Sequence, residues 1–441
     1  MNVYFDMVGC RLNQAEIDQL ALDLVARGHQ VVSEAQLADF IIVNTCCVTQ
    51  KAAADSRKMI RHYQHSSSKV IATGCWATVN PAEAEQLVGL EGVFPNGQKA
   101  RLAEFLPSQS QARLLHSELP PERPDLGQRH RTRGFLKVQD GCDNHCSYCL
   151  TRTARGASRS IPIKDIIAQA RQYQQLGVQE IILSGVQLGS FGRDLEDRAS
   201  LADLLRKLLE ATEIPRLRLS SIEPWDVTDE LLSLWEDPRL CRHLHIPLQS
   251  GSDRILREMR RPITVDKFSR LMNAIQSCLP GVSVTTDLIV GFPGETDSDV
   301  EATRELIEQL RFSGGHVFRF SAMAGTPAAV MPLQVAEAVK HQRSRIFIDL
   351  FNKAKIDFAR SKLGGRLQVL FEQQEASAGS QNLFSGYSGE YIRVSASSEV
   401  NLVNQIVSVG AEAVDSQGQI SGIVVAAQSQ KANSIQAAKS P

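Results

Sequence analysis

The chain has 441 residues, with 48 lysines and arginines, 49 aspartates and glutamates, and nine cysteines. This length predicts roughly two to four domains, and 43% hydrophobic with 22% charged residues excludes a wholly disordered chain. The net charge of −1 excludes a protein that coats nucleic acid through its overall charge, although it does not exclude a local basic patch.

The sequence has no run near the roughly 18 apolar residues that a membrane span needs. Its N-terminus, MNVYFDMVGC, lacks the basic segment and cleavage site of a secretory signal. We therefore expect a cytoplasmic protein without a membrane partner. Cysteines are reduced in that compartment, where clustered thiols bind metal or take part in chemistry.

Residues 1–104 alternate apolar strand-like runs with helical periodicity. The expected strands are Asn2–Val8, Phe40–Asn44, Lys69–Thr73 and Gly92–Pro95, and the expected helices are Gln14–Ala26, Ala52–Tyr63 and Pro81–Val88. Such alternation with short loops predicts a parallel sheet covered by helices.

Residues 105–133 contain four prolines without sustained periodicity, which predicts an interdomain linker. Residues 134–335 return to alternation. The expected strands are Phe135–Val138, Glu180–Leu183, Leu217–Ser220, His243–Pro247, Val282–Ile289 and His316–Phe320, with helices near 164–176, 200–210, 228–235, 265–277 and 297–310. Six strand–helix repeats predict a partial (βα)6 barrel, because a complete eightfold barrel takes about 250 residues.

The remainder of the chain changes class. Residues 336–365 predict a helical connector, and residues 366–428 carry short strand patterns separated by Gly, Ser and Asn. That pattern predicts a small five-stranded, OB-like β-barrel. The polar residues 429–441 predict a disordered tail. The predicted fold class is therefore α/β, with a parallel α/β domain, a partial barrel and a terminal β-barrel.

Three cysteines lie together in VQDGCDNHCSYCL. Cys142, Cys146 and Cys149 have the spacing C-x3-C-x2-C directly after the first strand of the middle domain. Three thiolates on one loop can hold three corners of a cubane iron–sulfur cluster and leave one iron open for a ligand. The alternative is a zinc site with His145 or His130 as the fourth ligand, although zinc sites usually pair two short cysteine spacings.

Three other cysteines each follow a predicted strand of the first domain. They are Cys10, Cys46 and Cys75. Parallel strands deliver their carboxyl ends to one sheet edge, so these thiols can converge on a second cluster. The alternative is that they are ordinary buried cysteines. Cys47 points away from Cys46 on extended backbone, and Cys241 and Cys278 have no partner in the pattern.

The C-x3-C-x2-C motif, with an aromatic residue before its last cysteine, opens a strand–helix repeat domain and resembles the radical SAM superfamily. The preceding cysteines in Gly-Cys, Asn-Thr-Cys and Gly-Cys contexts resemble its methylthiotransferase family. The likeness runs from GCRLNQ (9–14) to the terminal barrel, which is similar to the RNA-binding TRAM domain.

The family has three branches, which modify isopentenyladenosine in tRNA, threonylcarbamoyladenosine in tRNA, or an aspartate of a ribosomal protein. The second branch is resembled most, through FLKVQDGC (135–142), ARGASRS (154–160), SGVQLGSFG (184–192), LSSIEP (219–224) and AGTPAA (324–329).

The resemblance implies two 4Fe–4S clusters, one on each cysteine triad, and S-adenosylmethionine bound to the open iron of the second triad. It implies that a radical from S-adenosylmethionine removes hydrogen from C2 of the adenine, and that the first cluster supplies the methylthio group. The implied partners are a tRNA anticodon stem-loop and a low-potential electron donor such as flavodoxin or ferredoxin.

The resemblance also assigns residues to S-adenosylmethionine, most of them past the ends of barrel strands, where barrel enzymes keep their sites. They are Tyr148, Gly185, Gln187, Glu223, Gln249, Ser250 and Asp287. Each has an alternative interpretation as an ordinary turn or packing residue.

Arg152, Arg155 and Arg159 follow the cluster loop and are predicted to bind RNA phosphates or the threonyl carboxylate of the substrate, unless they form a solvated surface run. Thr151-Arg152-Thr153 replaces the Ile-Pro-Tyr-like residues of the family, which would alter the entrance of the pocket.

Charge is unevenly distributed in the last part of the chain. Residues 366–430 hold two Arg, no Lys and six acidic residues, whereas the segment 340–366 is basic. We expect this basic segment and the linker residues Arg123, Arg129, Arg131 and Arg133 to attract RNA, and Phe384 or Tyr387 to stack on bases. The alternative is an amphipathic helix with solvated charges.

Three hypotheses follow for the function. The first is methylthiolation of threonylcarbamoyladenosine at tRNA position 37. The second is methylthiolation of isopentenyladenosine in tRNA or of a ribosomal-protein aspartate. The third is a non-catalytic iron–sulfur or zinc protein that binds RNA.

Overall fold

The computed structural model describes residues 1–87, 89–106, 132–378 and 381–425. The chain divides into two compact units, Met1–Lys355 and Ile356–Pro441. Most of the predicted linker, including Arg123, Arg129, Arg131 and His130, and the whole predicted tail lie outside the described residues. The domain boundaries stay predictions. Among the described helices, none combines the length and apolar character that crossing a bilayer requires.

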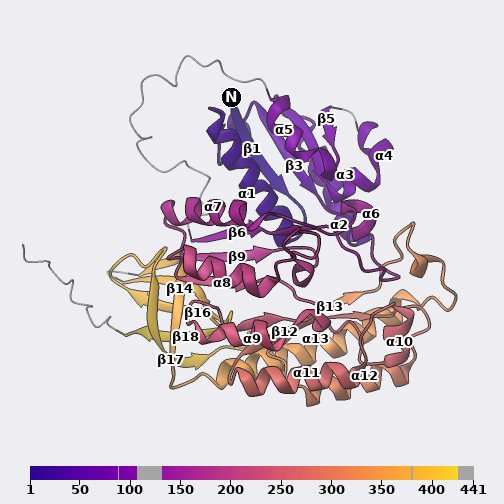
Figure 1. Ribbon diagram of the computed structural model, residues 1–441, viewed down its shortest axis with the longest axis vertical. Coiled ribbons are helices and arrows are strands. Elements are labelled where there is room, and N and C mark those ends of the chain that lie inside the picture. The colour runs from indigo at the N-terminus through magenta and orange to yellow at the C-terminus, as the bar shows by residue number, and fades with distance from the viewer. Residues whose placement is uncertain (88, 107–131, 379–380, 426–441) are drawn as a thin grey trace, which may run out of the picture. The chain divides into compact units, whose positions relative to one another are not determined.

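The N-terminal part of the first unit is a five-stranded parallel sheet in the order β2-β1-β3-β4-β5 (Figure 1). Its strands are β1 (Asn2–Met7), β2 (Gln30–Val31), β3 (Phe40–Thr45), β4 (Lys69–Gly74) and β5 (Leu90–Phe94). Its helices are α1 (Arg11–Ala26), α2 (Gln50–Tyr63), α3 (Cys75–Val79), α4 (Pro81–Glu85) and α5 (Lys99–Phe105). The central strand β3 is buried along its whole length, as expected for a sheet covered on both faces.

The middle part contains six parallel strands in chain order. They are β6 (Arg133–Lys137), β9 (Glu180–Ser184), β10 (Arg216–Leu219), β11 (His243–His245), β12 (Ser283–Val290) and β13 (Gly314–Arg319). They form two three-stranded sheets, β6-β9-β10 and β11-β12-β13, and parallel bridges from Leu217 to Leu240 and from Ser221 to His245 link the two. The predicted partial barrel is confirmed.

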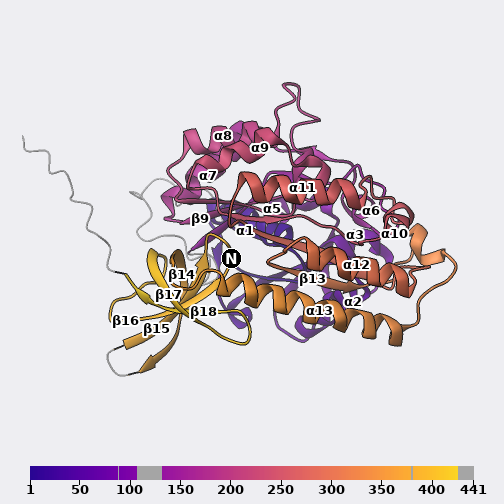
Figure 2. The same cartoon turned by 90° about the horizontal axis from the view of Figure 1, so that it is seen from below.

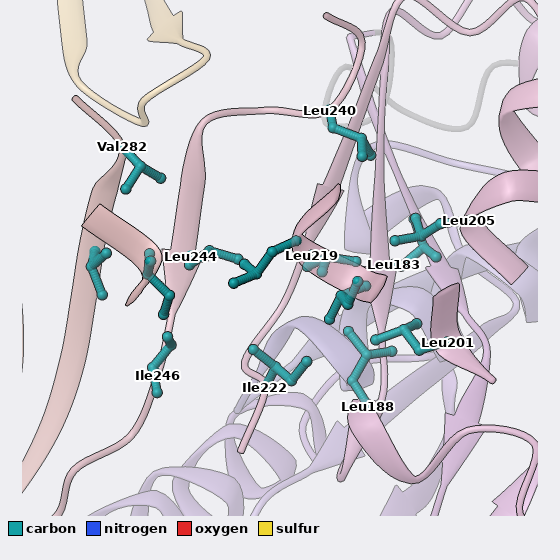
Figure 3. Packing of buried hydrophobic residues seen from close by; sticks show 14 of the residues in the cluster. Leu183, Leu188, Leu201, Leu205, Leu219, Ile222, Leu240, Leu244, Ile246 and Val282 are labelled. Carbon is teal, nitrogen blue, oxygen red and sulfur yellow. The ribbon is translucent and has the colours of Figure 1, made fainter. Parts of the chain in front are cut away.

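Helices cover the outside of these strands (Figure 2). The main ones are α7 (Ile163–Gln175), α8 (Leu201–Ala211), α9 (Asp229–Ser233), α11 (Val265–Cys278) and α12 (Asp297–Gln309). Leu183, Leu219 and Leu244 on three successive strands pack in one apolar core with Leu201 and Leu205 of α8 (Figure 3). This continuous core fixes the strand ends and therefore the loops that follow them.

Shorter elements complete the first unit. They are β7 (Gln139–Asp140), β8 (Arg159–Ser160), α6 (Thr151–Arg155) and α10 (Asp253–Glu258). Helix α13 (Glu337–Arg360) then leads into the second unit.

The second unit contains a closed barrel in the order β14-β15-β16-β18-β17. Its strands are β14 (Arg366–Ala378), β15 (Gln381–Ser388), β16 (Arg393–Ser398), β17 (Ile406–Val414) and β18 (Ile420–Val424). The predicted five-stranded barrel is confirmed. Phe384 is fully buried in its core, so the expectation that Phe384 stacks on RNA bases is wrong. The period of two along β15 turns that ring inward.

Candidate active site

Close backbone contacts hold the loop that carries Cys142, Cys146 and Cys149. At its start, Gly141 has φ +71°, and a Cβ there would lie 1.9 Å from the Ala157 carbonyl oxygen. The Cys142 amide donates to the Gly156 carbonyl at 3.1 Å. These contacts explain why glycine precedes the first cysteine.

The middle of the loop is tied to two distant segments through Ser147. The Ser147 amide donates to the Met259 carbonyl at 3.1 Å, and the Ala328 amide donates to the Ser147 carbonyl at 2.8 Å. The Ser147 hydroxyl donates to the Glu258 carbonyl at 2.7 Å. These hydrogen bonds fix the backbone between Cys146 and Cys149.

Backbone amides donate hydrogen bonds to the thiols, and burial changes their pKa. The Asn144 amide donates to Cys142 Sγ at 3.4 Å, and the Thr151 amide donates to Cys149 Sγ at 3.4 Å. Burial raises the pKa of Cys142 to about 12 and also raises the pKa of Cys146. Buried thiols of this kind release their protons when a metal binds, which couples metal loading to proton release.

Polar side chains from successive strand ends lie beside these cysteines. Gln187, which follows β9, accepts a hydrogen bond from Cys142 Sγ through Oε1 at 3.2 Å. Glu223, which follows β10, binds both guanidinium nitrogens of Arg261 at 3.0 and 2.7 Å. Arg261 also acts on Cys146, where its charge opposes the rise in that pKa caused by burial. Arg261 was not predicted from the sequence, because it belongs to no motif and only its positive charge sets it apart.

A cavity of about 200 Å³ opens beside Cys149. Gln249 has a left-handed backbone (φ 74°), and its buried Oε1 has no hydrogen-bond partner among the described residues. On the next strand, Asp287 Oδ1 lies 3.2 Å from His245 Nε2. The lining includes Tyr148, Cys149, Gln249, Asp287, Phe318 and Arg319, together with Val48 and Thr49 from the sheet domain. An unsatisfied amide beside a carboxylate suits a polar ligand that carries both donors and acceptors.

Gly185 and Ser250 have packing roles in the structure. A Cβ at Gly185 would lie 3.0 Å from Gln139 Oε1. The buried Ser250 hydroxyl accepts from the Ser252 amide at 3.2 Å, which holds the turn after Gln249. Their assignment to S-adenosylmethionine stays a prediction.

The other cysteine triad lies at one edge of the five-stranded sheet. Cys10 precedes α1, Cys46 follows β3, and Cys75 is the first residue of α3. A Cβ at Gly9 would lie 3.2 Å from Cys46 Sγ, so the first two loops pack closely. Burial raises the pKa of Cys46 to about 11, and the neighbouring Cys10 and Cys75 raise it further. The three thiols therefore act on one another electrostatically, and their role as ligands of one cluster stays a prediction.

No three His, Cys, Asp or Glu side chains within the described ranges converge on a position for a single metal ion. The same result applies to both cysteine triads, so the cluster ligands and the zinc alternative with His145 all stay predictions, and His130 lies outside the described residues. The spacing of the cysteines favours iron–sulfur clusters over zinc, because zinc sites usually pair two short cysteine spacings.

The three predicted arginines separate in the structure. Arg152 and Arg159 are exposed. Arg155 is only 5% exposed, and its guanidinium binds Glu16 and Asp140 at 2.8 and 3.0 Å. Because its charge is neutralised inside the protein, the prediction that Arg155 binds RNA or the substrate carboxylate is wrong.

Comparisons with known proteins identify the family of this chain. Residues 136–307 match the radical SAM superfamily, and residues 2–94 match the Uncharacterized protein family UPF0004. A protein of Thermotoga maritima is 35% identical over 429 residues, which cover 95% of this chain and 96% of the relative. A protein of Bacillus subtilis is 33% identical over 419 residues, with 92% and 93% coverage. Both are named threonylcarbamoyladenosine tRNA methylthiotransferase MtaB.

This chain belongs to the radical SAM tRNA methylthiotransferases. Family membership makes it an enzyme that transfers sulfur-containing groups, with S-adenosylmethionine and 4Fe–4S clusters as cofactors. The family also includes a protein of Methylacidiphilum infernorum named tRNA-2-methylthio-N(6)-dimethylallyladenosine synthase, 30% identical over 392 residues, which cover 84% of each chain.

A solved structure shares the fold of this methylthiotransferase. The radical S-adenosylmethionine methyltransferase TsrM of Kitasatospora setae, with cobalamin and a [4Fe-4S] cluster bound, superposes with a TM-score of 0.55. It is 15% identical in sequence, and the match covers 75% of this chain and 77% of TsrM.

Proposed function

We propose that the enzyme adds a methylthio group to C2 of N6-threonylcarbamoyladenosine at position 37 of tRNA. The observation that carries this proposal is the cavity beside Cys149, which is also lined by Val48 and Thr49. Val48 follows Cys46 by two residues in the sequence, which supports the proposal that this space lies between the two cysteine triads. A base bound there would meet both cluster sites, as pre-positioned reactants require.

The residues would divide the work as follows. Cys142, Cys146 and Cys149 would hold one 4Fe–4S cluster, and Cys10, Cys46 and Cys75 would hold the other. When bound, the clusters and S-adenosylmethionine supply the radical and sulfur chemistry, and the protein supplies placement. The residues proposed to hold S-adenosylmethionine are Tyr148, Gln187, Glu223, Gln249 and Asp287, with Gly185 and Ser250 as further predicted contacts.

Arg261 joins this set through the charge it presents next to Glu223 and Cys146. Its guanidinium stacks on the Trp225 ring at 4.7 Å and donates to the Pro247 carbonyl at 2.9 Å. These contacts fix its orientation, so that its bidentate pair with Glu223 holds that carboxylate in place beside Cys146.

Two exposed features are proposed to meet RNA. Arg152 and Arg159 lie on the surface of the first unit and can reach phosphates. On the barrel of the second unit, Tyr387 and Tyr391 stack with ring centroids 4.9 Å apart and an interplanar angle of 21°. Both rings are only half-buried, which suits stacking on an unpaired base.

The segment 340–366 exposes less positive charge than its sequence indicates. Lys340 is buried and pairs with Glu337 at 2.7 Å, and Arg343 is buried between Glu295 and Asp297. Lys353 and Lys355 are exposed. Reversing both charges should weaken tRNA affinity by at least several-fold if this helix attracts RNA, and unchanged affinity would favour a solvated helix.

We also propose that the enzyme works in the cytoplasm, where tRNA and reduced thiols are both available. It would receive electrons from a low-potential donor such as flavodoxin or ferredoxin.

Nucleosides from the tRNA of a strain that lacks this protein, measured by mass spectrometry, test the function. Loss of the 2-methylthio form of threonylcarbamoyladenosine is the expected result. Loss of the 2-methylthio form of isopentenyladenosine would instead support the second candidate, which the similarity to dimethylallyladenosine synthases favours. Unchanged tRNA nucleosides would contradict both and point to a ribosomal-protein aspartate or a non-catalytic role.

A further inference from the structure

A buried ion network connects the loop of Cys149 to the sheet that carries the other triad. Arg155 Nη1 lies 2.8 Å from Glu16 Oε1 and 3.0 Å from Asp140 Oδ1. Arg155 Nη2 donates to Asn13 Oδ1 at 2.9 Å. One guanidinium therefore bonds across 139 residues of sequence to Glu16 and across 142 to Asn13.

Further cations surround the same carboxylate. Lys137 Nζ lies 2.9 Å from Glu16 Oε1 and 2.7 Å from Asp140 Oδ2. Lys99 Nζ also pairs with Glu16, and it donates to Asn44 Oδ1 at 3.1 Å. Three cations thus meet two carboxylates in a largely buried site, where each bond has a strong directional preference.

The members of this network are close in sequence to the proposed cluster ligands. Asn13 follows Cys10 by three residues, and Asn44 precedes Cys46 by two. On the other side, Arg155 follows Cys149 by six residues at the end of α6. The network therefore touches the supporting residues of both triads.

Asn96 makes a second link of the same kind. Its Nδ2 donates to Cys75 Sγ at 3.5 Å and to the Ala154 carbonyl at 2.8 Å. Ala154, the residue next to Arg155, is therefore linked to Cys75 through the side-chain amide of Asn96.

We propose that Arg155 is a positioning residue that fixes the separation and orientation of the two cluster sites. Its planar guanidinium binds Glu16, Asn13 and Asp140 at once, and a flexible ammonium could not hold all three in one plane. The proposal rests on the proposed function, because only an enzyme that uses both clusters on one base needs this spacing. A role in stability alone is the competing explanation.

The test uses full-length protein with both clusters loaded under anaerobic conditions, in four forms. They are the wild type, Arg155→Gln, Arg155→Lys, and the control Arg304→Gln. Arg304 is an arginine of α12 that also pairs with two carboxylates, Glu301 and Glu308, on the surface. Three quantities are measured for each: iron per chain, the ratio of 5′-deoxyadenosine to methylthio product, and the magnetic interaction between the two reduced clusters by electron paramagnetic resonance.

We expect Arg155→Gln to retain iron and cleavage of S-adenosylmethionine, to raise the 5′-deoxyadenosine-to-product ratio at least tenfold, and to alter the magnetic interaction. Arg155→Lys should lie between this variant and wild type, and Arg304→Gln should match wild type. Wild-type ratio and interaction in Arg155→Gln would overturn the proposal, and so would loss of iron in step with loss of product.

If Arg155→Gln fails to fold, Arg155→Lys decides, since it keeps the buried charge but cannot hold Glu16, Asn13 and Asp140 in one plane. It should change the magnetic interaction in the same direction, and an unchanged interaction would overturn the proposal. If wild type modifies none of the tested tRNAs, the proposed function fails, whereas the magnetic interaction still tests the role of Arg155.

Discussion

Asp18 gives α1 a pH-dependent effect on stability. The residue is 4% exposed, and its Oδ1 accepts a hydrogen bond from Gln14 Nε2 at 2.8 Å. Burial raises the pKa of Asp18 from 3.8 to about 7, despite hydrogen bonds from Gln14 and the Phe135 amide. Between about pH 4 and 7 the folded chain keeps a proton that the unfolded chain has lost. The free energy of unfolding therefore falls as pH rises through this window and is constant above it.

The change to test is Asp18→Asn, which imitates the protonated acid. A difference of about 3 pKa units corresponds to about 4 kcal/mol. The amide accepts fewer hydrogen bonds than the carboxyl, which costs about 1 kcal/mol. We expect Asp18→Asn to be more stable than wild type by about 3 kcal/mol at pH 8 and by less than about 1 kcal/mol at pH 5.

Urea unfolding of the iron-free proteins, followed by far-ultraviolet circular dichroism at both pH values, measures this difference. The exposed Asp165→Asn is the control and should shift the free energy of unfolding by less than about 1 kcal/mol at either pH. A destabilised Asp18→Asn at pH 8, or an advantage that does not shrink at pH 5, would refute the reasoning.

Three further changes test the network, the loop and the barrel core. Burial alone would raise the pKa of Glu16, but Lys99, Arg155 and Lys137 hold it well below its usual range. Glu16→Gln should therefore cost about 3–5 kcal/mol in urea unfolding at pH 7, an effect that fades below about pH 4.5, whereas Glu91→Gln in the exposed pair with Lys69 should cost less than about 1 kcal/mol. Gly141→Ala should lower iron from about eight to about four per chain by assay, while Gly97→Ala, with nothing within 4 Å of the added Cβ, should keep about eight; equal iron would contradict the loop argument. Arg218→Met should cost about 3–5 kcal/mol because it leaves the fully buried Glu180 without its 2.7 Å partner, and Arg218→Met with Glu180→Met should recover most of that loss in the same assay.

The strands could be predicted well because parallel buried strands are continuous apolar runs with clear ends. Strand β2 has only two residues, Gln30–Val31, which is too short to show a period. Helices α6 and α10 have five and six residues, less than two turns, so helical periodicity could not reveal them.

The sequence indicates which cysteines are candidate ligands, but it does not indicate the residues that support them. The spacing of the cysteines is a local feature, so the motif that begins at Cys142 can be recognised from the sequence alone. Whether Arg155 faces RNA or Glu16 depends on a contact across 139 residues, and arginine has the same chemistry in both settings. For the same reason, Arg261 and Asn96 gave no sign of their contacts with Cys146 and Cys75.

Strand β6 lies at the edge of its sheet, and α1 packs against it. The Phe135 amide on that edge bonds to Asp18 of α1. An uncovered strand edge is a template for intermolecular pairing. The sheet domain thus covers this edge of the partial barrel through α1. Dividing the gene between them would yield a barrel fragment that aggregates, even with every cluster-loop cysteine in place.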